Sequence, residues 1–107
     1  MENVYKKKTM ETLPLDAIRT YLSSAPIEKA WLFGSFARGE ENDKSDVDLL
    51  VSFDKEAKVS LLKRAAITCD LEDILCRPVD LVNELSLFPE VRKEIDNDKI
   101  LIYERSA

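Results

Sequence analysis

Both glycines of this 107-residue chain, Gly34 and Gly39, lie in one stretch, Leu32 to Phe53. A short apolar run, residues 30–33, leads into this stretch and to the first glycine, and a second run, residues 47–53, follows a polar segment. Glycine is favoured where the backbone takes left-handed dihedrals or approaches a ligand closely. A chain that uses glycine nowhere else is therefore expected to have a special turn here, between two short buried strands.

Two aspartates, Asp46 and Asp48, stand at the entrance of the second apolar run. Alternate side chains of a strand share a face, so both carboxylates point one way, while the odd-numbered apolar residues from Val47 to Phe53 point into a core. Two carboxylates about 4 Å apart repel each other by roughly 4 kcal/mol at an effective dielectric constant near 20. A shared proton, a basic residue or a cation must offset this repulsion. Carboxylates suit hard ions such as Mg²⁺, which one or two carboxylates often bind together with substrate phosphates.

The turn after the first apolar run has the composition of a phosphate site. Gly34-Ser35 ends the run, and we expect residues 36–38 to form the first turn of a helix. Backbone N–H groups at a helix start, together with a serine hydroxyl, bind anions. Arg38 adds donors that match phosphate geometry. A phosphate cradle and a paired-carboxylate metal site on adjacent strand ends would together hold a metal-bound nucleoside triphosphate.

In this chain Gly34-Ser35 is followed after ten residues by Asp46-Val47-Asp48. This spacing resembles the signature of the DNA polymerase β-like nucleotidyltransferase superfamily. The fuller string is similar to the minimal nucleotidyltransferases of bacteria and archaea. Many of those are antitoxin subunits paired with a HEPN-domain protein. The resemblance implies a nucleotidyltransferase fold of the α/β (α+β) class, with a small mixed sheet of about four strands and helices mainly on one face.

A third carboxylate, Asp80, lies in the apolar segment Val79–Val82, which we expect to form the third strand. A lone charge in such a strand is costly unless it is paired, and taken alone it fits a structural ion pair or an exposed edge. The resemblance implies instead a third aspartate that helps hold the catalytic metal near the attacking hydroxyl. The predicted catalytic residues and metal ligands are Asp46, Asp48 and Asp80, and the predicted nucleotide-binding residues are Gly34, Ser35 and Arg38.

The implied chemistry is nucleotidyl transfer. Two divalent ions about 3.5–4 Å apart, Mg²⁺ or in its place Mn²⁺, would clamp the α-phosphate between attacking and leaving oxygens. By resemblance, AMP from ATP would be transferred to a hydroxyl group of a HEPN toxin, in particular that of a tyrosine. This modification would neutralise the toxin. Two alternatives stay open: a non-catalytic antitoxin that binds nucleotide and acts by contact, and a small-molecule nucleotidyltransferase. The intact triad argues against the first, and the lack of room for an acceptor domain argues against the second unless a partner or a second copy supplies one.

Composition limits the remaining possibilities. We expect one domain over residues 1–107, with residues 1–12 as a flexible tail. The net charge of −5 disfavours direct nucleic-acid binding, which relies on basic patches. No apolar run approaches the roughly 18 residues of a membrane span, and the spacing of the two cysteines matches no zinc or redox motif. We expect a cytoplasmic protein in a hetero-oligomer with its partner or in a homodimer.

Apolar periodicity predicts the other elements. These are helices over 13–24, over 59–76 and from Pro89, strands over 29–33 and 100–103, and a turn at 96–98.

The helix expected over 59–76 is apolar on a wide arc. One stripe comprises Leu62, Ala66 and Cys69, and six further apolar residues broaden it. Such an arc is wider than one contact with a sheet requires. It fits either a well-buried helix or a helix whose outer side contacts a partner.

Overall fold

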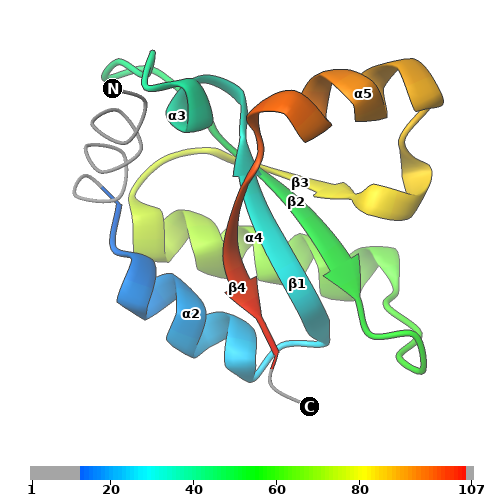
Figure 1. The fold of residues 1–107 in the computed structure, drawn as a ribbon. Helices are drawn as coiled ribbons and strands as arrows, with labels where there is room; N and C mark the ends of the chain where they lie inside the picture. Colours follow the sequence, from blue (N-terminus) through cyan, green and yellow to red (C-terminus); the bar gives the residue numbers. More distant parts are fainter. Residues whose placement is uncertain (1–12, 106–107) are drawn as a thin grey trace.

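A four-stranded mixed sheet forms the centre of the computed structural model, which describes residues 13–105 (Figure 1). The spatial order is β3-β2-β1-β4, with β2 and β3 parallel and β1 antiparallel to both β2 and β4. The strands are β1 (Ile27–Phe33), β2 (Val47–Phe53), β3 (Val79–Asn83) and β4 (Ile100–Glu104). The predicted α/β class and mixed sheet are confirmed. The predicted tail, residues 1–12, lies outside the described residues.

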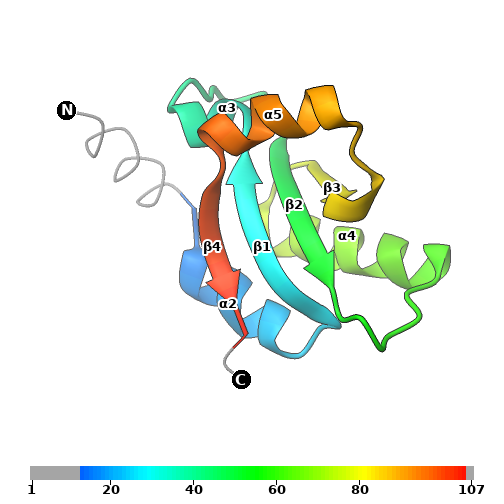
Figure 2. The same cartoon turned by 45° about the vertical axis from the view of Figure 1, so that its right-hand side comes forward.

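The described part of the chain also contains four α-helices: α2 (Leu15–Ser23), α3 (Gly34–Arg38), α4 (Leu61–Leu75) and α5 (Pro89–Asp98). A 3₁₀ turn, η1 (Glu84–Ser86), leads into α5. Helices α2 and α4 cover one face of the sheet, whereas α3 and α5 lie at the end where β1 stops and β2 begins (Figures 1 and 2). Among residues 13–105 no helix combines the length and the apolarity that crossing a membrane requires.

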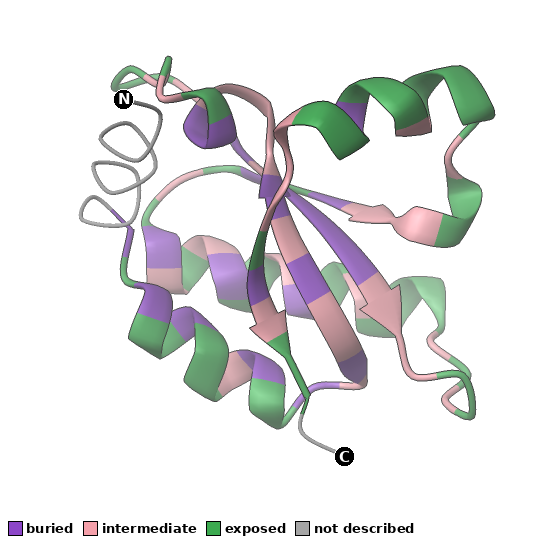
Figure 3. Cartoon of the chain, viewed as in Figure 1, coloured by how far each residue is buried: buried purple, intermediate pink, exposed green. Residues whose placement is uncertain are grey.

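The hydrophobic core lies between the sheet and the pair α2 and α4 (Figure 3). In β2, Val47, Leu49 and Val51 are buried, as their alternation predicted. The helices contribute Leu15, Ile18 and Leu22 from α2 and Ile67, Leu71 and Leu75 from α4. Because these contacts fix the odd-numbered side of β2 against the helices, its even-numbered side chains face the opposite surface of the sheet.

Helix α4 differs from its predicted counterpart in the side that is buried. The stripe of Leu62, Ala66 and Cys69 is exposed, and Leu61 beside it is exposed as well. The helix packs on the sheet through the side described above. The interpretation of α4 as a well-buried helix is therefore wrong, because α4 belongs to an outer layer and meets the sheet on one side only.

Helix α5 continues through residues 96–98, so the predicted turn at this position is wrong. Its start at Pro89 agrees with the prediction, since a proline in the first turn needs no hydrogen-bond partner for its nitrogen. The polar residues at its other end form the last helical turn. This turn brings Asp98 close to Arg38 of α3.

Candidate functional site

Asp48 and Asp80 are direct partners in the register of the parallel strands β2 and β3. Partners in neighbouring strands present their side chains on the same face. The two carboxylates therefore share the face that lies opposite to α2 and α4. Asp46 lies two residues earlier, just ahead of β2, and both it and Asp80 are exposed, whereas Asp48 is half-buried.

The electrostatics of Asp48 reflect these neighbours. Burial is the largest cause that raises the pKa of Asp48 above the usual aspartate value, and the negative charges of Asp80 and Asp46 raise it further. The guanidinium of Arg38 lowers the same pKa. The three predicted carboxylates thus repel one another, and a cation bound between them would relieve that repulsion.

The donor chemistry of the three carboxylates fits a hard divalent cation, which prefers oxygen ligands. Within residues 13–105, however, no three acidic, cysteine or histidine side chains are already grouped closely enough to hold a metal ion. Asp46 and Asp80 are exposed, so their side chains can rotate towards Asp48 without displacing packed atoms. The carboxylates therefore fit Mg²⁺ in charge and in donor type, although they are spread more widely than the ligands of a closed metal cage.

Gly34 brings the turn after β1 directly against Asp48. It opens α3 with a φ of 73°, and the preceding residue, Phe33, is the register partner of Asp48. A Cβ atom added at Gly34 would lie 2.1 Å from Oδ2 of Asp48, which no real side chain could do. The predicted phosphate-binding turn and the predicted carboxylate site are therefore in contact, and any side chain at position 34 would have to displace the Asp48 carboxylate.

Arg38, at the end of α3, is held by two acidic side chains. Its Nε donates a hydrogen bond to Oε1 of Glu40 at 2.8 Å, and its Nη1 lies 3.7 Å from Oδ2 of Asp98. A hollow of about 480 Å³ between α3 and α5 is lined by Gly34, Arg38 and Asp98 among others, a size typical of small-molecule sites. Ser35 is half-buried in the first turn of α3 and is not part of this lining.

Comparison with known proteins assigns this arrangement to a family. The family model described as polymerase beta, nucleotidyltransferase matches residues 16–107. The chain belongs to the polymerase β nucleotidyltransferase family. The nucleotidyltransferase activity that the sequence predicted is thereby confirmed at the level of the family.

Relatives of this nucleotidyltransferase include proteins named as adenylyltransferases. A provisionally named protein adenylyltransferase of Methanocaldococcus jannaschii is 40% identical over 72 residues, which cover 66% of this chain and 72% of the relative. The protein adenylyltransferase MntA of Thermococcus cleftensis is 37% identical over 76 residues, which cover 71% of this chain and 75% of the relative.

Solved structures share the fold of this nucleotidyltransferase. A crystal structure of a toxin–antitoxin with AMP-PNP matches with a TM-score of 0.73 at 21% identity, over 88% of this chain and 76% of that one. A provisionally named minimal nucleotidyltransferase matches with a TM-score of 0.59 at 28% identity, over 92% and 93% of the two chains. The complex of tri-AMPylated Shewanella oneidensis HEPN toxin with MNT antitoxin gives 0.57 at 17% identity, over 98% and 74%. The predicted nucleotidyltransferase fold is confirmed.

Arg77 has a role in this nucleotidyltransferase that the sequence did not indicate. Its Nη1 donates hydrogen bonds to the carbonyl oxygens of Asn42 at 3.0 Å and of Ser45 at 3.1 Å. Its guanidinium carbon lies 5.0 Å from the centroid of the Phe36 ring. The side chain thus ties the loop that leads into Asp46 to α3. Its partners are 35 and 32 residues away in the chain, so no local pattern could have revealed them.

Replacing Arg77 with alanine is expected to lower the free energy of unfolding by about 1–3 kcal/mol, because hydrogen bonds from a charged donor and a cation–π contact are lost. Lysine keeps the charge but lacks the planar guanidinium group, so the free energy of unfolding of Arg77→Lys should lie between those of the alanine variant and the wild type. Urea unfolding measures this free energy for both variants. A lower kcat at saturating ATP is expected as well, since the loop before Asp46 is freed. If Arg77→Ala unfolds like the wild type, Arg77 does not hold this loop.

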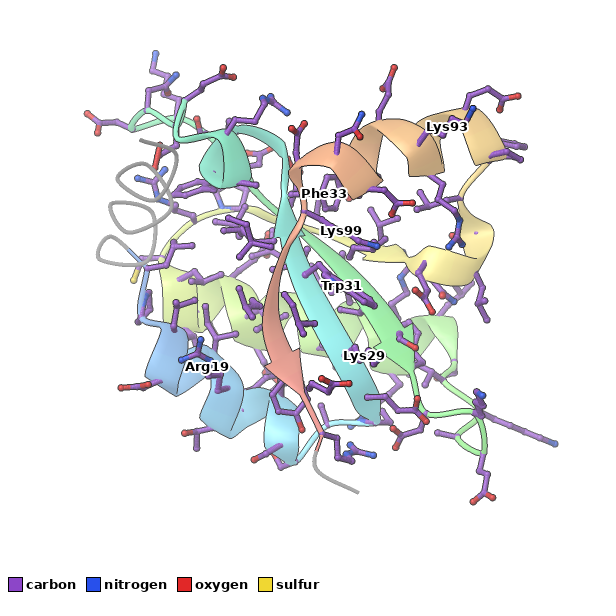
Figure 4. All side chains as sticks on the ribbon, in the orientation of Figure 1. Arg19, Lys29, Trp31, Phe33, Lys93 and Lys99 are labelled. Atoms are coloured by element: carbon purple, nitrogen blue, oxygen red, sulfur yellow. The ribbon has the colours of Figure 1, made fainter. Side chains whose placement is uncertain are left out.

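The face beside the carboxylates also carries aromatic and basic side chains. Phe33, Trp31 and Lys29 follow one another along β1, and Lys99 lies next to Trp31 (Figure 4). The Nζ of Lys99 is 4.8 Å from the centroid of the Trp31 ring, and the Nζ of Lys29 is 3.4 Å from Oε2 of Glu104. The Trp31 ring is therefore already in contact with a cation of the chain itself, which favours a packing role over stacking with a base.

Proposed function

We propose that the chain transfers AMP from ATP to a hydroxyl group of a protein partner, and that this modification makes it the antitoxin of a HEPN toxin. The observation that carries the proposal is the pairing of Asp48 with Asp80 directly against the turn at Gly34. The adenylyltransferase names of the relatives support AMP as the transferred group. The fold shared with an MNT antitoxin in complex with a HEPN toxin supports a protein as the acceptor.

Asp46, Asp48 and Asp80 would hold the divalent ions, Mg²⁺ or in its place Mn²⁺. When bound there, such ions neutralise charge on the triphosphate and lower the pKa of an acceptor hydroxyl. The chain itself supplies the position of the substrate. The backbone at Gly34 and the side chains of Ser35 and Arg38 bind the β- and γ-phosphates, which places the α-phosphate beside the carboxylates.

The transfer exchanges one phosphorus–oxygen bond for another. The acceptor oxygen attacks the α-phosphorus, the bond from this phosphorus to the oxygen that bridges to the β-phosphate breaks, and pyrophosphate leaves. The proton of the acceptor hydroxyl passes to a carboxylate oxygen of Asp80. Because Asp80 is exposed on an edge strand, an acceptor on another protein can reach it from outside. The hollow between α3 and α5 gives room for the nucleoside.

Parallel reactions with α-labelled and γ-labelled ATP test this proposal, each containing Mg²⁺ and the product of the gene beside that for this chain, which we expect to be a HEPN-domain protein. We expect label on the HEPN protein from α-labelled ATP only, with a mass increase equal to one or more AMP groups. Label from γ-labelled ATP would mean phosphoryl transfer and would contradict the proposal. A HEPN variant with the modified tyrosine changed to phenylalanine should accept no label if tyrosine is the acceptor.

A contact-only antitoxin is the second candidate, because the exposed apolar side of α4 offers a surface for binding a partner without any transfer. It predicts that an Asp46→Asn/Asp48→Asn variant still neutralises the toxin in a growth assay. The transfer mechanism predicts that this variant binds the toxin and fails to protect. Toxicity of the HEPN protein in the presence of the double variant therefore separates the two candidates.

A further inference from the structure

We infer that the outer side of α4 is the surface on which the protein partner docks, and that the docked part of the partner is an apolar helix flanked by acidic residues. The existence of a protein partner rests on the proposed function, whereas the docking surface is argued from the residues below. We call this surface the α4 outer strip. It consists of Leu61, Leu62, Ala65, Ala66 and Cys69, all of which are exposed.

The leucines of the α4 outer strip are exposed to an unusual degree. Leu61 is 85% exposed and Leu62 is 82% exposed. Leu85 of η1, which is 83% exposed, lines a hollow of about 360 Å³ together with Leu61. The start of α4 and Leu85 of η1 thus present exposed leucines to one hollow, although polar residues such as Arg64, Asn83 and Glu84 also line it. Contiguous exposed apolar surface of this kind marks interaction sites, whereas single exposed leucines do not.

The shape of the strip fits a helix. Along α4 the two leucines are followed by the small side chains of Ala65, Ala66 and Cys69, over which the backbone of a second helix can approach closely. The neighbouring edge strand β3 is a poorer template for an added strand, because the guanidinium of Arg64 donates a hydrogen bond to the carbonyl oxygen of Leu81. Docking through side chains of a packed helix therefore suits this side of the molecule better than strand addition.

Charge around the strip indicates the composition of the partner. Residues 55–64 contain four basic residues and one acidic residue, Glu56, although the whole chain has a net charge of −5. Lys58 and Lys63 are exposed beside the two leucines in the sequence. These basic residues lie at the leucine end of the strip, whereas Asp70 and Asp73 are exposed at its other end. The leucine end therefore attracts an acidic partner surface and repels a basic one. The helix that fits is apolar on one side and acidic where it meets the two leucines.

The strip is also within reach of the reaction site. Helix α4 lies on the covered face of the sheet and the carboxylates lie on the other face, so the partner must pass around an edge. On the α4 side this edge is β3, which pairs with no further strand in residues 13–105. A strand of five residues spans about 16 Å at roughly 3.3 Å per residue, so the edge to be passed is short. A folded domain of about 100 residues has a radius of gyration near 13 Å. A partner of that size docked on α4 is wide enough to extend past β3 and present a hydroxyl to Asp80, near the start of this strand.

The test compares Leu61→Gln/Leu62→Gln with the matched variant Leu101→Thr, which changes a 45% exposed leucine in the opposite edge strand. Glutamine is a good helix former, so α4 is expected to stay folded, which thermal unfolding checks. Calorimetry with the HEPN-domain protein should show a dissociation constant raised about 30-fold or more by the double variant and unchanged by Leu101→Thr. The KM for the HEPN protein should rise equally, with kcat at saturating HEPN protein unchanged.

Two further measurements complete the test: binding by a charge variant, and the molecular mass in solution of the chain without its partner. Lys58→Glu/Lys63→Glu should slow association with the HEPN protein, and added salt should reduce the difference from the wild type. If binding is indifferent to Leu61→Gln/Leu62→Gln, the docking surface is elsewhere while the proposed function stands. If the double variant halves the mass of the chain alone, the strip binds a second copy and the inference is wrong. If the wild type does not bind the HEPN protein at all, the proposed partner is wrong as well.

Discussion

Replacing Asp48 with asparagine is expected to reduce AMP transfer by about 10³-fold or more while leaving the chain folded. The change keeps the size of the side chain but removes the one carboxylate that lies against Gly34 and opposite Asp80. Stabilisation of charge at the reacting phosphate carries most of the catalysis of such a transfer, and loss of one such group has large effects. The initial rate of labelling of the HEPN protein at saturating ATP measures the loss.

The same variant should be more stable than the wild type near neutral pH without added metal. The pKa of Asp48 is raised in the folded state, so the folded chain binds this proton more tightly than the unfolded chain does. Stability from this group is present below the ordinary aspartate pKa and is lost as pH rises through the raised value. Thermal unfolding from about pH 3 to about pH 8 should show the two proteins diverging across this window. Mg²⁺ should raise the unfolding temperature of the wild type more than that of Asp48→Asn.

Asp43→Asn is the matched control for charge, because Asp43 is an exposed aspartate in the loop that precedes β2. It should keep both transfer activity and the pH dependence of the wild type. Normal transfer by Asp48→Asn would contradict the assignment of this carboxylate to the site, whereas equal loss in Asp43→Asn would show only a general effect of charge on ATP binding.

The sequence indicated the carboxylate face of this molecule because the relevant information is local. Alternation in β2 alone places Asp48 opposite to the buried side of the strand, and Gly34 marks the turn that needs a left-handed backbone. The position of Asp80 could not be predicted from local sequence, since neither β2 nor β3 shows in its own residues that the two strands pair. Only the resemblance to a family supplied it, and the register of the two strands agrees.

Contacts between distant segments were not predicted either, because local sequence does not show which distant segments meet. The pair of Arg38 and Asp98 depends on α5 running through residues that, by composition, favour a turn. Arg77 donates to backbone carbonyl groups of a loop rather than to side chains, so the residue types in that loop do not indicate the contact. Helix α4 carries apolar residues on several sides, and periodicity could not tell the side on the sheet from the outer strip.

The close approach of Gly34 to Asp48 leads to the second large effect. Gly34→Ala is expected to lower the free energy of unfolding by about 1–3 kcal/mol, since alanine at a φ of 73° is strained. It should also reduce transfer by about 100-fold, because the new Cβ, 2.1 Å from Oδ2, must push the Asp48 carboxylate aside. Urea unfolding and the labelling rate measure the two effects separately.

Gly39→Ala separates the effect of backbone strain at a positive φ from the effect of the contact with Asp48. Gly39 has nearly the same φ, 72°, but lies at the other end of α3 from Asp48. It should therefore lose similar stability and keep most of its transfer activity. The contact itself is isolated by repeating Gly34→Ala in an Asp48→Ala background, where the oxygen that the Cβ would meet is gone. There the cost in stability should fall towards that of Gly39→Ala, since backbone strain and a 3.3 Å contact with the Cβ of residue 48 remain. An undiminished excess cost in that background would show that Gly34 is required for a reason other than the carboxylate.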